Sequence, residues 1–128
     1  MGSAPVVLVV DSDKDIRDFI EILLTDEGYK FLGVASLSAA LALLGQQPPN
    51  VLLLDAFYPG IQTFVEEYYK RPGTRATIIL MTTGFAPEQV AAELRINAYL
   101  AKPFNVNELL DLIQRCTSRP SLRTAATA

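Results

Sequence analysis

Five short apolar segments, each a continuous run rather than an alternation of apolar and polar residues, constrain most strongly how this 128-residue chain can fold. Strands that are covered on both faces of a sheet have this pattern. Segments with a helical period separate the runs. Because strands and helices alternate and their connections are expected to be right-handed crossovers, we predict an α/β fold, a doubly wound parallel sheet with helices on both sides. The predicted strands are Val6–Val10, Phe31–Ala35, Val51–Leu54, Thr77–Met81 and Ala98–Ala101.

The first two intervening segments have clear helix signals. Apolar residues recur at the helical period before Gly28, which can end the first helix in a left-handed conformation. Ser36 can cap a second helix that ends at Gly45. The side chains expected to face inward are Ile16, Phe19, Ile20, Leu23 and Leu24 on the first helix, and Ala40, Leu43 and Leu44 on the second.

The later segments predict three more helices. One is expected around Phe64 to Tyr69, and Pro87 suits the first turn of the next. Asn105 is followed three residues later by Glu108, which predicts a capping box at the start of the last helix. The residues expected to face inward are Val90, Ala91 and Leu94, then Val106, Leu109, Leu110 and Ile113.

Composition narrows the class of protein. Half of the residues are apolar, and no apolar run approaches the ~20 residues needed to cross a bilayer, so one soluble domain over 1–118 is expected, followed by a loose tail over 119–128. A formal charge of −3 without a basic block argues against direct binding to nucleic acid or a membrane surface. Cys116 is the only cysteine and the start has no secretory signal, which favours a cytoplasmic location.

Polar side chains follow four of the predicted strands, at the edge where open parallel sheets form their sites. Asp11 follows the first strand, Asp55 the third, Thr82 the fourth and Lys102 the fifth. The chain has no histidine, so its chemistry must use carboxylates, hydroxyls and lysines. Two carboxylates, one hydroxyl and one ammonium group are therefore expected to meet at this edge.

With Pro59-Gly60 after Asp55 and Pro103 after Lys102, these residues resemble the signature of the response regulator receiver domains. Asp before Pro-Gly is by itself commonly a turn, and a lysine before proline is commonly a surface residue. All of these elements in order, each at the end of a strand, make a specific resemblance that covers roughly 6–116. It implies a flavodoxin-like five-stranded sheet of order 2-1-3-4-5 with five helices.

The resemblance also implies a chemistry. Asp55 would accept a phosphoryl group and become an aspartyl phosphate, with Lys102 as countercharge. Asp11, Asp55 and the backbone carbonyl of Phe57 would bind Mg²⁺, which suits a pair of carboxylates that otherwise repel one another. By the same resemblance the Thr82 hydroxyl would move to the new phosphoryl oxygens and Tyr99 would follow it, although Tyr99 can equally be an aromatic plug at the sheet edge.

Partners follow from the same resemblance. Because the chain has no histidine, the phosphohistidine donor must be a separate sensor histidine kinase or histidine phosphotransfer protein. The chain would then be a signalling switch of a two-component system that assists its own phosphoryl transfer and hydrolysis. The downstream effector stays open, as does the choice between monomer and homodimer.

The chain departs from the family pattern in several places. Ser12 occupies the place of the second acidic residue, and Asp13 could compensate if the chain stays extended there. Ile61-Gln62-Thr63 replaces the usual acidic-glycine turn, and the short interval from Thr82 to Tyr99 predicts a short or displaced fourth helix. The alternative function is therefore a receiver-like interaction module that does not depend on phosphorylation. A flavin- or nucleotide-binding domain would instead need a glycine-rich phosphate loop, and the residues from Asp11 onward are acidic.

Three tyrosines lie just before or within the expected third helix. Tyr58, Tyr68 and Tyr69 are interpreted as a cover for the third helix rather than as ligands.

Overall fold

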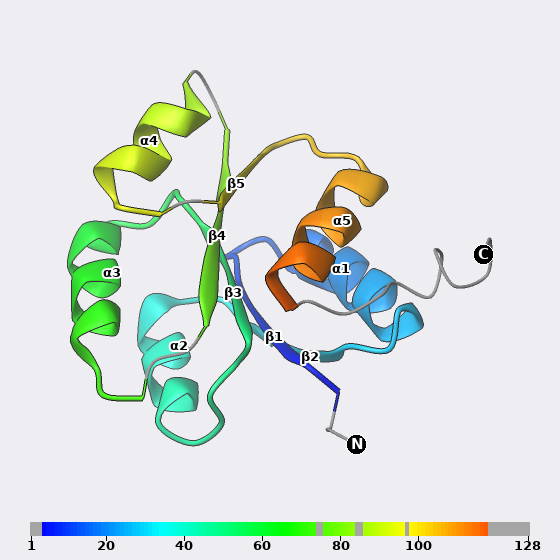
Figure 1. Ribbon diagram of the computed structural model, residues 1–128, viewed down its shortest axis with the longest axis horizontal. Helices are drawn as coiled ribbons and strands as arrows, with labels where there is room; N and C mark the ends of the chain where they lie inside the picture. Colours follow the sequence, from blue (N-terminus) through cyan, green and yellow to red (C-terminus); the bar gives the residue numbers. More distant parts are fainter. Residues whose placement is uncertain (1–3, 74–75, 84–85, 97, 118–128) are drawn as a thin grey trace.

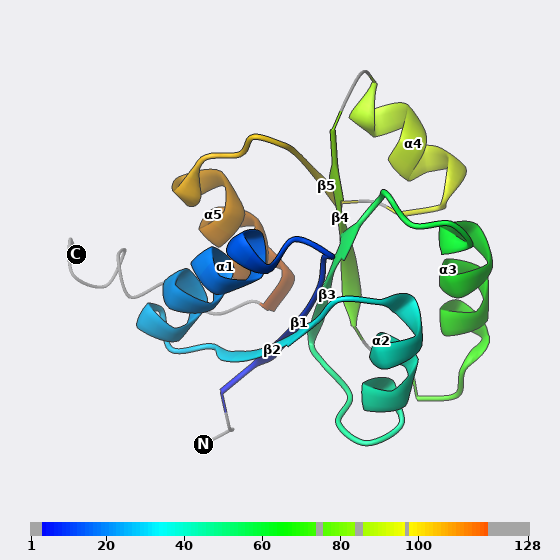
Figure 2. The ribbon, with the colours of Figure 1, turned by 180° about the vertical axis from the view of Figure 1, so that it is seen from behind.

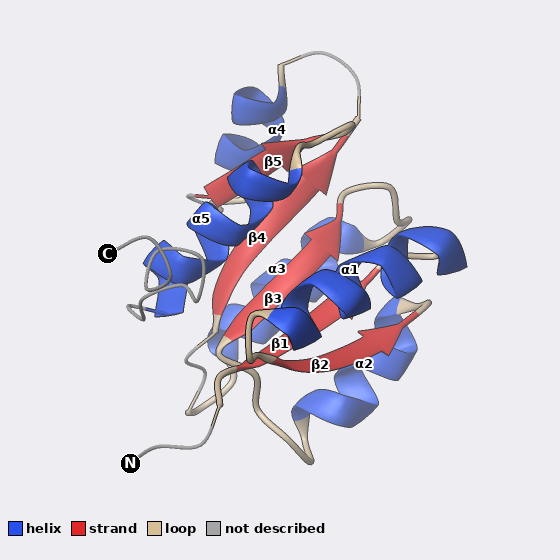
Figure 3. Ribbon diagram, turned by 90° about the vertical axis from the view of Figure 1, so that its right-hand side faces the viewer, coloured by secondary structure: helices blue, strands red, loops and turns tan. Residues whose placement is uncertain are grey.

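The fold is built on one parallel sheet. The computed structural model describes residues 4–73, 76–83, 86–96 and 98–117. The strands run in the order β2-β1-β3-β4-β5, as predicted, and their arrows point the same way in Figure 3. Their bounds are β1 (Val6–Val10), β2 (Lys30–Val34), β3 (Val51–Asp55), β4 (Thr77–Thr82) and β5 (Ala98–Ala101). The predicted tail over 119–128 and the domain end at 118 lie outside the described residues.

Helices cover both faces of the sheet. Two of them, α1 (Lys14–Asp26) and α5 (Val106–Thr117), lie on one face (Figure 1). The other face carries α2 (Leu37–Leu44), α3 (Ile61–Lys70) and α4 (Pro87–Glu93), as the view from behind also shows (Figure 2). None of the helices in the described part of the chain is long and apolar enough to cross a membrane.

The apolar core is divided by the sheet into two clusters. Along β3 the side chains alternate, so Leu53 packs into the cluster beneath α1 and α5, whereas Leu54 packs into the cluster beneath α2, α3 and α4. All five residues of β3 are buried. In this central strand a continuous apolar run is needed, because each residue from Val51 to Leu54 meets a covered face on one side or the other.

Helix starts follow the predicted caps where a side chain supplies one. The Ser36 hydroxyl accepts a hydrogen bond from the backbone N–H of Ala39 at the start of α2. Asn105 and Glu108 form the reciprocal capping box of α5, with each side chain accepting the backbone N–H of the other residue. After α1, Gly28 adopts a φ of 84°, as expected for a residue that ends a helix in the left-handed region.

Some expectations need correction. Phe19, expected inside, is 47% exposed, because the inward stripe of α1 centres on Ile20 and Leu24. The third helix is longer than predicted, and β2 begins and ends one residue earlier. Asp55 and Thr82, predicted to follow their strands, are the last residues of β3 and β4. The fourth helix is short, with 7 residues, as the short interval before Tyr99 predicted.

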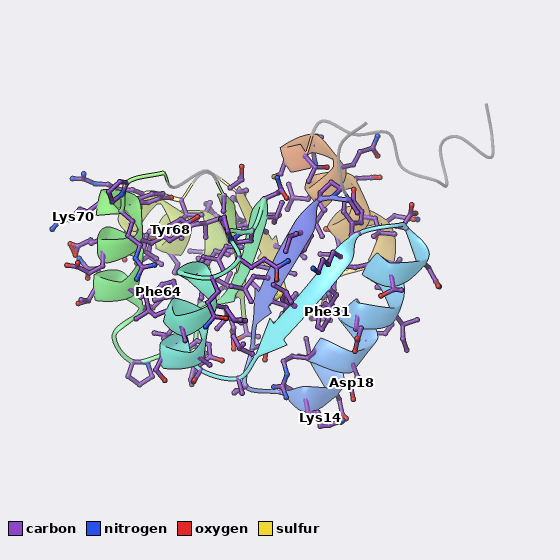
Figure 4. The ribbon with its side chains drawn as sticks, turned by 90° about the horizontal axis from the view of Figure 1, so that it is seen from below. Lys14, Asp18, Phe31, Phe64, Tyr68 and Lys70 are labelled. Atoms are coloured by element: carbon purple, nitrogen blue, oxygen red, sulfur yellow. The ribbon has the colours of Figure 1, made fainter. Side chains whose placement is uncertain are left out.

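The edge strand β2 packs closely against α1. A Cβ atom at Gly33 would lie 2.6 Å from Cζ of Phe31 and 3.6 Å from Cδ of Arg17. Figure 4 shows Phe31 between β2 and α1, and Lys14 and Asp18 at the beginning of α1. On the opposite face, Phe64 and Tyr68 of α3 are buried, whereas Lys70 points outward. Glycine at position 33 therefore leaves room for the Phe31 ring, whereas the distance to Arg17 would be an ordinary contact.

Candidate functional site

Three charged side chains meet at the carboxyl ends of β1, β3 and β5. Lys102 Nζ lies 2.7 Å from Asp11 Oδ2 and 3.5 Å from Asp55 Oδ1. The side chains of Lys102, Asp11 and Asp55 are only 13%, 1% and 11% exposed, respectively. The strand order brings them together, because β1 and β4 both flank β3, and β5 lies beside β4. The predicted convergence of the two aspartates and the lysine is therefore present.

Asp55 uses its two carboxylate oxygens unequally. Its Oδ1 accepts the backbone N–H of Phe57 at 3.3 Å and also faces Lys102. Among the described residues, no hydrogen bond reaches its Oδ2. Burial raises the pKa of Asp55, and the negative charge of Asp11 raises it further, while Lys102 and the Phe57 N–H act in the opposite direction.

Asp11 is held from several directions. Its Oδ1 accepts the backbone N–H of Asp13 at 2.9 Å, and its own N–H donates to the carbonyl of Val34 at the end of β2. The Arg17 guanidinium donates to the Asp11 carbonyl at 2.8 Å. With Lys102 on Oδ2, both oxygens of this buried carboxylate have a partner, as a charge so far from water requires.

Ser12 and Asp13 lie at the rim of this site. Both are exposed, and Asp13 is the N-cap of α1, its Oδ1 accepting the backbone N–H groups of Asp15 and Ile16. Its carboxylate is therefore engaged by the helix start. Within the described ranges, no group of three or more His, Cys, Asp or Glu side chains is placed so that it could hold a metal ion.

The donor groups at the site suit a hard divalent cation. Asp11 and Asp55 have carboxylate oxygens, and the predicted third ligand is the backbone carbonyl of Phe57, the second residue after Asp55. All are oxygen donors of the kind that Mg²⁺ prefers, and Asp55 Oδ2 accepts no hydrogen bond within the described part of the chain. The residues present therefore fit such an ion. A second acidic residue in place of Ser12 would have provided one more carboxylate.

Thr82 and Tyr99, the predicted switch residues, lie on neighbouring strands. Thr82 is 5% exposed, its hydroxyl donates to the Thr83 carbonyl at 3.2 Å, and its carbonyl accepts the Lys102 N–H. Tyr99 pairs in register with Leu80 of β4 and is 41% exposed. Phe57 is 84% exposed, so the contribution predicted for it at the metal site depends on its backbone carbonyl and not on its ring.

Two side chains near the site were not predicted as part of it. The Tyr58 hydroxyl donates to the Ala35 carbonyl at 2.8 Å, and burial together with the charges of Asp11 and Asp55 raises the pKa of Tyr58 to about 12. The other is Arg17, which contacts the Asp11 backbone. Tyr58 could have been suspected because it follows Asp55 by three residues, but its partner lies 23 residues away in sequence.

Comparison with known proteins agrees with this geometry. The family model for the response regulator receiver domain matches residues 7–114. The chain is 32% identical over 120 residues to an uncharacterised 14.6 kDa protein of Leptolyngbya boryana, covering 89% of this chain and 92% of that protein. It is 30% identical over 122 residues to an NtrX-like response regulator of Rickettsia bellii (strain RML369-C), covering 91% of this chain and 26% of that protein.

A solved structure is similar over nearly the whole chain. The crystal structure of a response regulator from Chloroflexus aurantiacus J-10-fl superposes with a TM-score of 0.81 at 28% identity, covering 91% of this chain and 99% of that chain. The chain thus spans about a quarter of the NtrX-like relative and nearly all of the other two proteins. Since the family model covers most of the chain, and the predicted fold is the one observed, the chain belongs to the response regulator receiver domain family of two-component signalling.

Proposed function

We propose that this receiver domain is switched by phosphorylation of Asp55. The observation that carries the proposal is the position of Lys102 between Asp11 and Asp55. Asp55 Oδ1 accepts the Phe57 N–H and lies 3.5 Å from Lys102 Nζ, whereas no hydrogen bond from a described residue reaches Oδ2. A nucleophilic carboxylate needs one oxygen that can approach phosphorus. Asp55 meets that requirement at the rim of the sheet.

The proposed transfer is a simple displacement. A carboxylate oxygen of Asp55 forms a bond to phosphorus while the bond from phosphorus to the imidazole nitrogen of a phosphohistidine donor breaks, and that nitrogen keeps the electron pair. Negative charge spreads over the three equatorial oxygens, so the protein contributes mainly position and countercharge. Lys102 supplies a positive charge beside Asp55, and the Phe57 N–H orients the carboxylate.

Mg²⁺ is the cofactor that we propose for this site. Asp11, Asp55 and the Phe57 carbonyl would hold it, and the ion would supply further positive charge to stabilise the transferring group. Both oxygens of Asp11 already have hydrogen-bond partners, so an ion bound there competes with Lys102 for Asp11 Oδ2. Ser12 adds no charge to the site, which favours a modest affinity.

The donor and the response complete the proposal. Membership of the family implies exchange with a histidine kinase or a histidine phosphotransfer protein. We propose that Thr82 and Tyr99 transmit the change, because their strands adjoin Lys102 and the Tyr99 ring is partly exposed. We also propose that the domain assists the later hydrolysis of the aspartyl phosphate.

Acetyl phosphate with Mg²⁺ tests the proposal without a partner protein. Intact mass should rise by one phosphoryl group in the parent and in Asp26→Asn, whose aspartate is exposed at the end of α1. It should stay unchanged in Asp55→Asn. An unmodified parent would favour the receiver-like interaction module instead, and a modified Asp55→Asn would place the acceptor elsewhere.

A further inference from the structure

The contacts around the site form a closed ring that passes through the end of β2, a strand that contributes no charged side chain to the site. Asp11 N–H donates to the Val34 carbonyl at 3.2 Å, and the next carbonyl, that of Ala35, accepts the Tyr58 hydroxyl at 2.8 Å. From Tyr58 the chain leads back through Phe57 to Asp55. Lys102 closes the ring, because its Nζ faces both Asp55 and Asp11.

Within this ring, the connection from β3 to α3 is fixed at three consecutive positions. Ala56 N–H donates to the Met81 carbonyl at 2.8 Å, and Phe57 N–H donates to Asp55 Oδ1 at 3.3 Å. Tyr58 then reaches in the opposite direction, to Ala35. In the described part of the chain, no other hydrogen bond joins residues 56–60 to the connection between β2 and α2.

We propose that Tyr58 is a positioning residue for the phosphoacceptor site, acting through its hydrogen bond to Ala35. It holds the backbone of Phe57 in place from the β2 side, while Ala56 is held from the β4 side. The inference rests on the proposed function, because the Phe57 carbonyl is the backbone ligand proposed there for Mg²⁺. Tyr58 itself touches neither the ion nor the phosphoryl group in this proposal.

A purely structural role makes a different prediction. The Tyr58 ring packs against the cluster beneath α2, α3 and α4, and that packing alone would explain an aromatic residue here. Phenylalanine keeps the ring and loses only the hydroxyl. Tyr58→Phe therefore separates positioning from packing.

The chain offers a matched control on α3. The Tyr69 hydroxyl also donates to a backbone carbonyl, that of Arg95 at 3.3 Å, on the surface between α3 and the end of α4. Tyr69→Phe removes the same chemical group from the same residue type. Its hydrogen bond joins no member of the ring around Asp55.

Two measurements on the full chain test the proposal. Calorimetric titration with Mg²⁺ should give a dissociation constant for Tyr58→Phe roughly three- to tenfold above that of the parent, the effect of one lost neutral hydrogen bond. Backbone amide exchange, followed by NMR without metal or phosphate, should be faster for Phe57 in Tyr58→Phe only. Tyr69→Phe should match the parent in both measurements.

The outcomes separate the two proposals. A Phe57 amide that exchanges in Tyr58→Phe as it does in the parent would overturn the positioning role. So would an Mg²⁺ affinity that changes no more than in Tyr69→Phe when the parent binds the ion. A parent that neither binds Mg²⁺ nor accepts a phosphoryl group would overturn the proposed function, and the Phe57 amide would then decide the role of Tyr58 alone.

Discussion

Lys102 is not shared equally between the two carboxylates. Its Nζ is 0.8 Å closer to Asp11, at 2.7 Å compared with 3.5 Å, and Asp11 is the more deeply buried partner. A buried charge without a partner is costly, so the lysine stays with the carboxylate that has least access to water. Asp55 is left with weaker compensation, so burial, together with the negative charge of Asp11, raises the pKa of this carboxyl despite the nearby lysine.

This imbalance predicts that Asp55→Asn stabilises the protein at neutral pH. Because the pKa of Asp55 is raised in the folded state, ionised Asp55 costs stability above its folded pKa, and the cost disappears as the pH falls below the unfolded value of about 3.9. Urea unfolding should give Asp55→Asn a higher free energy of unfolding than the parent at pH 7. The difference should shrink towards pH 4, and a variant less stable than the parent at pH 7 would contradict the argument.

A second residue-scale prediction concerns the missing acidic group. Ser12 is exposed beside Asp11, and a carboxylate there would add negative charge and an oxygen ligand to the proposed ion site. Ser12→Asp should tighten Mg²⁺ binding about tenfold, the scale of changing one group in a metal site. Thr25→Asp, which adds the same charge near the far end of α1, is the control and should leave the affinity unchanged. Equal or weaker binding in Ser12→Asp would count against the proposed position of the ion.

At the scale of elements, predictions from sequence succeed where a side chain marks the boundary. The starts of α2 and α5 follow from Ser36 and from the Asn105 and Glu108 pair. The start of α3 was missed because Gly60 precedes it with a φ of 82° and no side-chain cap. Because Asp11, Asp55 and Lys102 lie at the ends of predicted strands, the sequence predicts that they meet. The hydrogen-bond partner of Tyr58 is a backbone carbonyl far away in sequence, which no local pattern encodes.

The start of α1 allows the role of Asp13 to be tested. Its carboxylate caps the helix, so Asp13→Ala should lower the free energy of unfolding by about 1 kcal/mol, while Asp13→Ser, which can still cap, should remain close to the parent. Chemical denaturation measures both variants. If the cap is the whole role of this side chain, the Mg²⁺ affinity of both stays that of the parent. Weaker binding in both would instead make Asp13 the compensating carboxylate.

At the scale of the whole molecule, one sheet joins two apolar clusters that do not depend on the same helices. Leu53 and Leu54 are adjacent, are both fully buried and belong to different clusters. Because β3 is central and its backbone carries both side chains, neither cluster can lose its packing without disturbing the strand that supports the other. The two layers should therefore unfold together.

Leu53→Ala and Leu54→Ala test this cooperativity. Each substitution should lower the free energy of unfolding by about 2–5 kcal/mol, the usual cost of removing a buried leucine side chain. Thermal unfolding followed by far-UV and near-UV circular dichroism should give coincident single transitions in both variants. Separate transitions in either variant would show that the layers on the two faces fold independently.

The unequal use of the Asp55 oxygens has a consequence for the modified protein. If the ester-like bond to phosphorus forms at Oδ2, the oxygen that remains a carbonyl is Oδ1, which already faces the Phe57 amide and Lys102. The anhydride would then be made without releasing the side chain from its existing donors, so the acceptor would need little rearrangement of its own. In the infrared spectrum, the carbonyl band of the acyl phosphate should lie at the frequency of a hydrogen-bonded carbonyl. A band at the frequency of a free carbonyl would exclude this geometry.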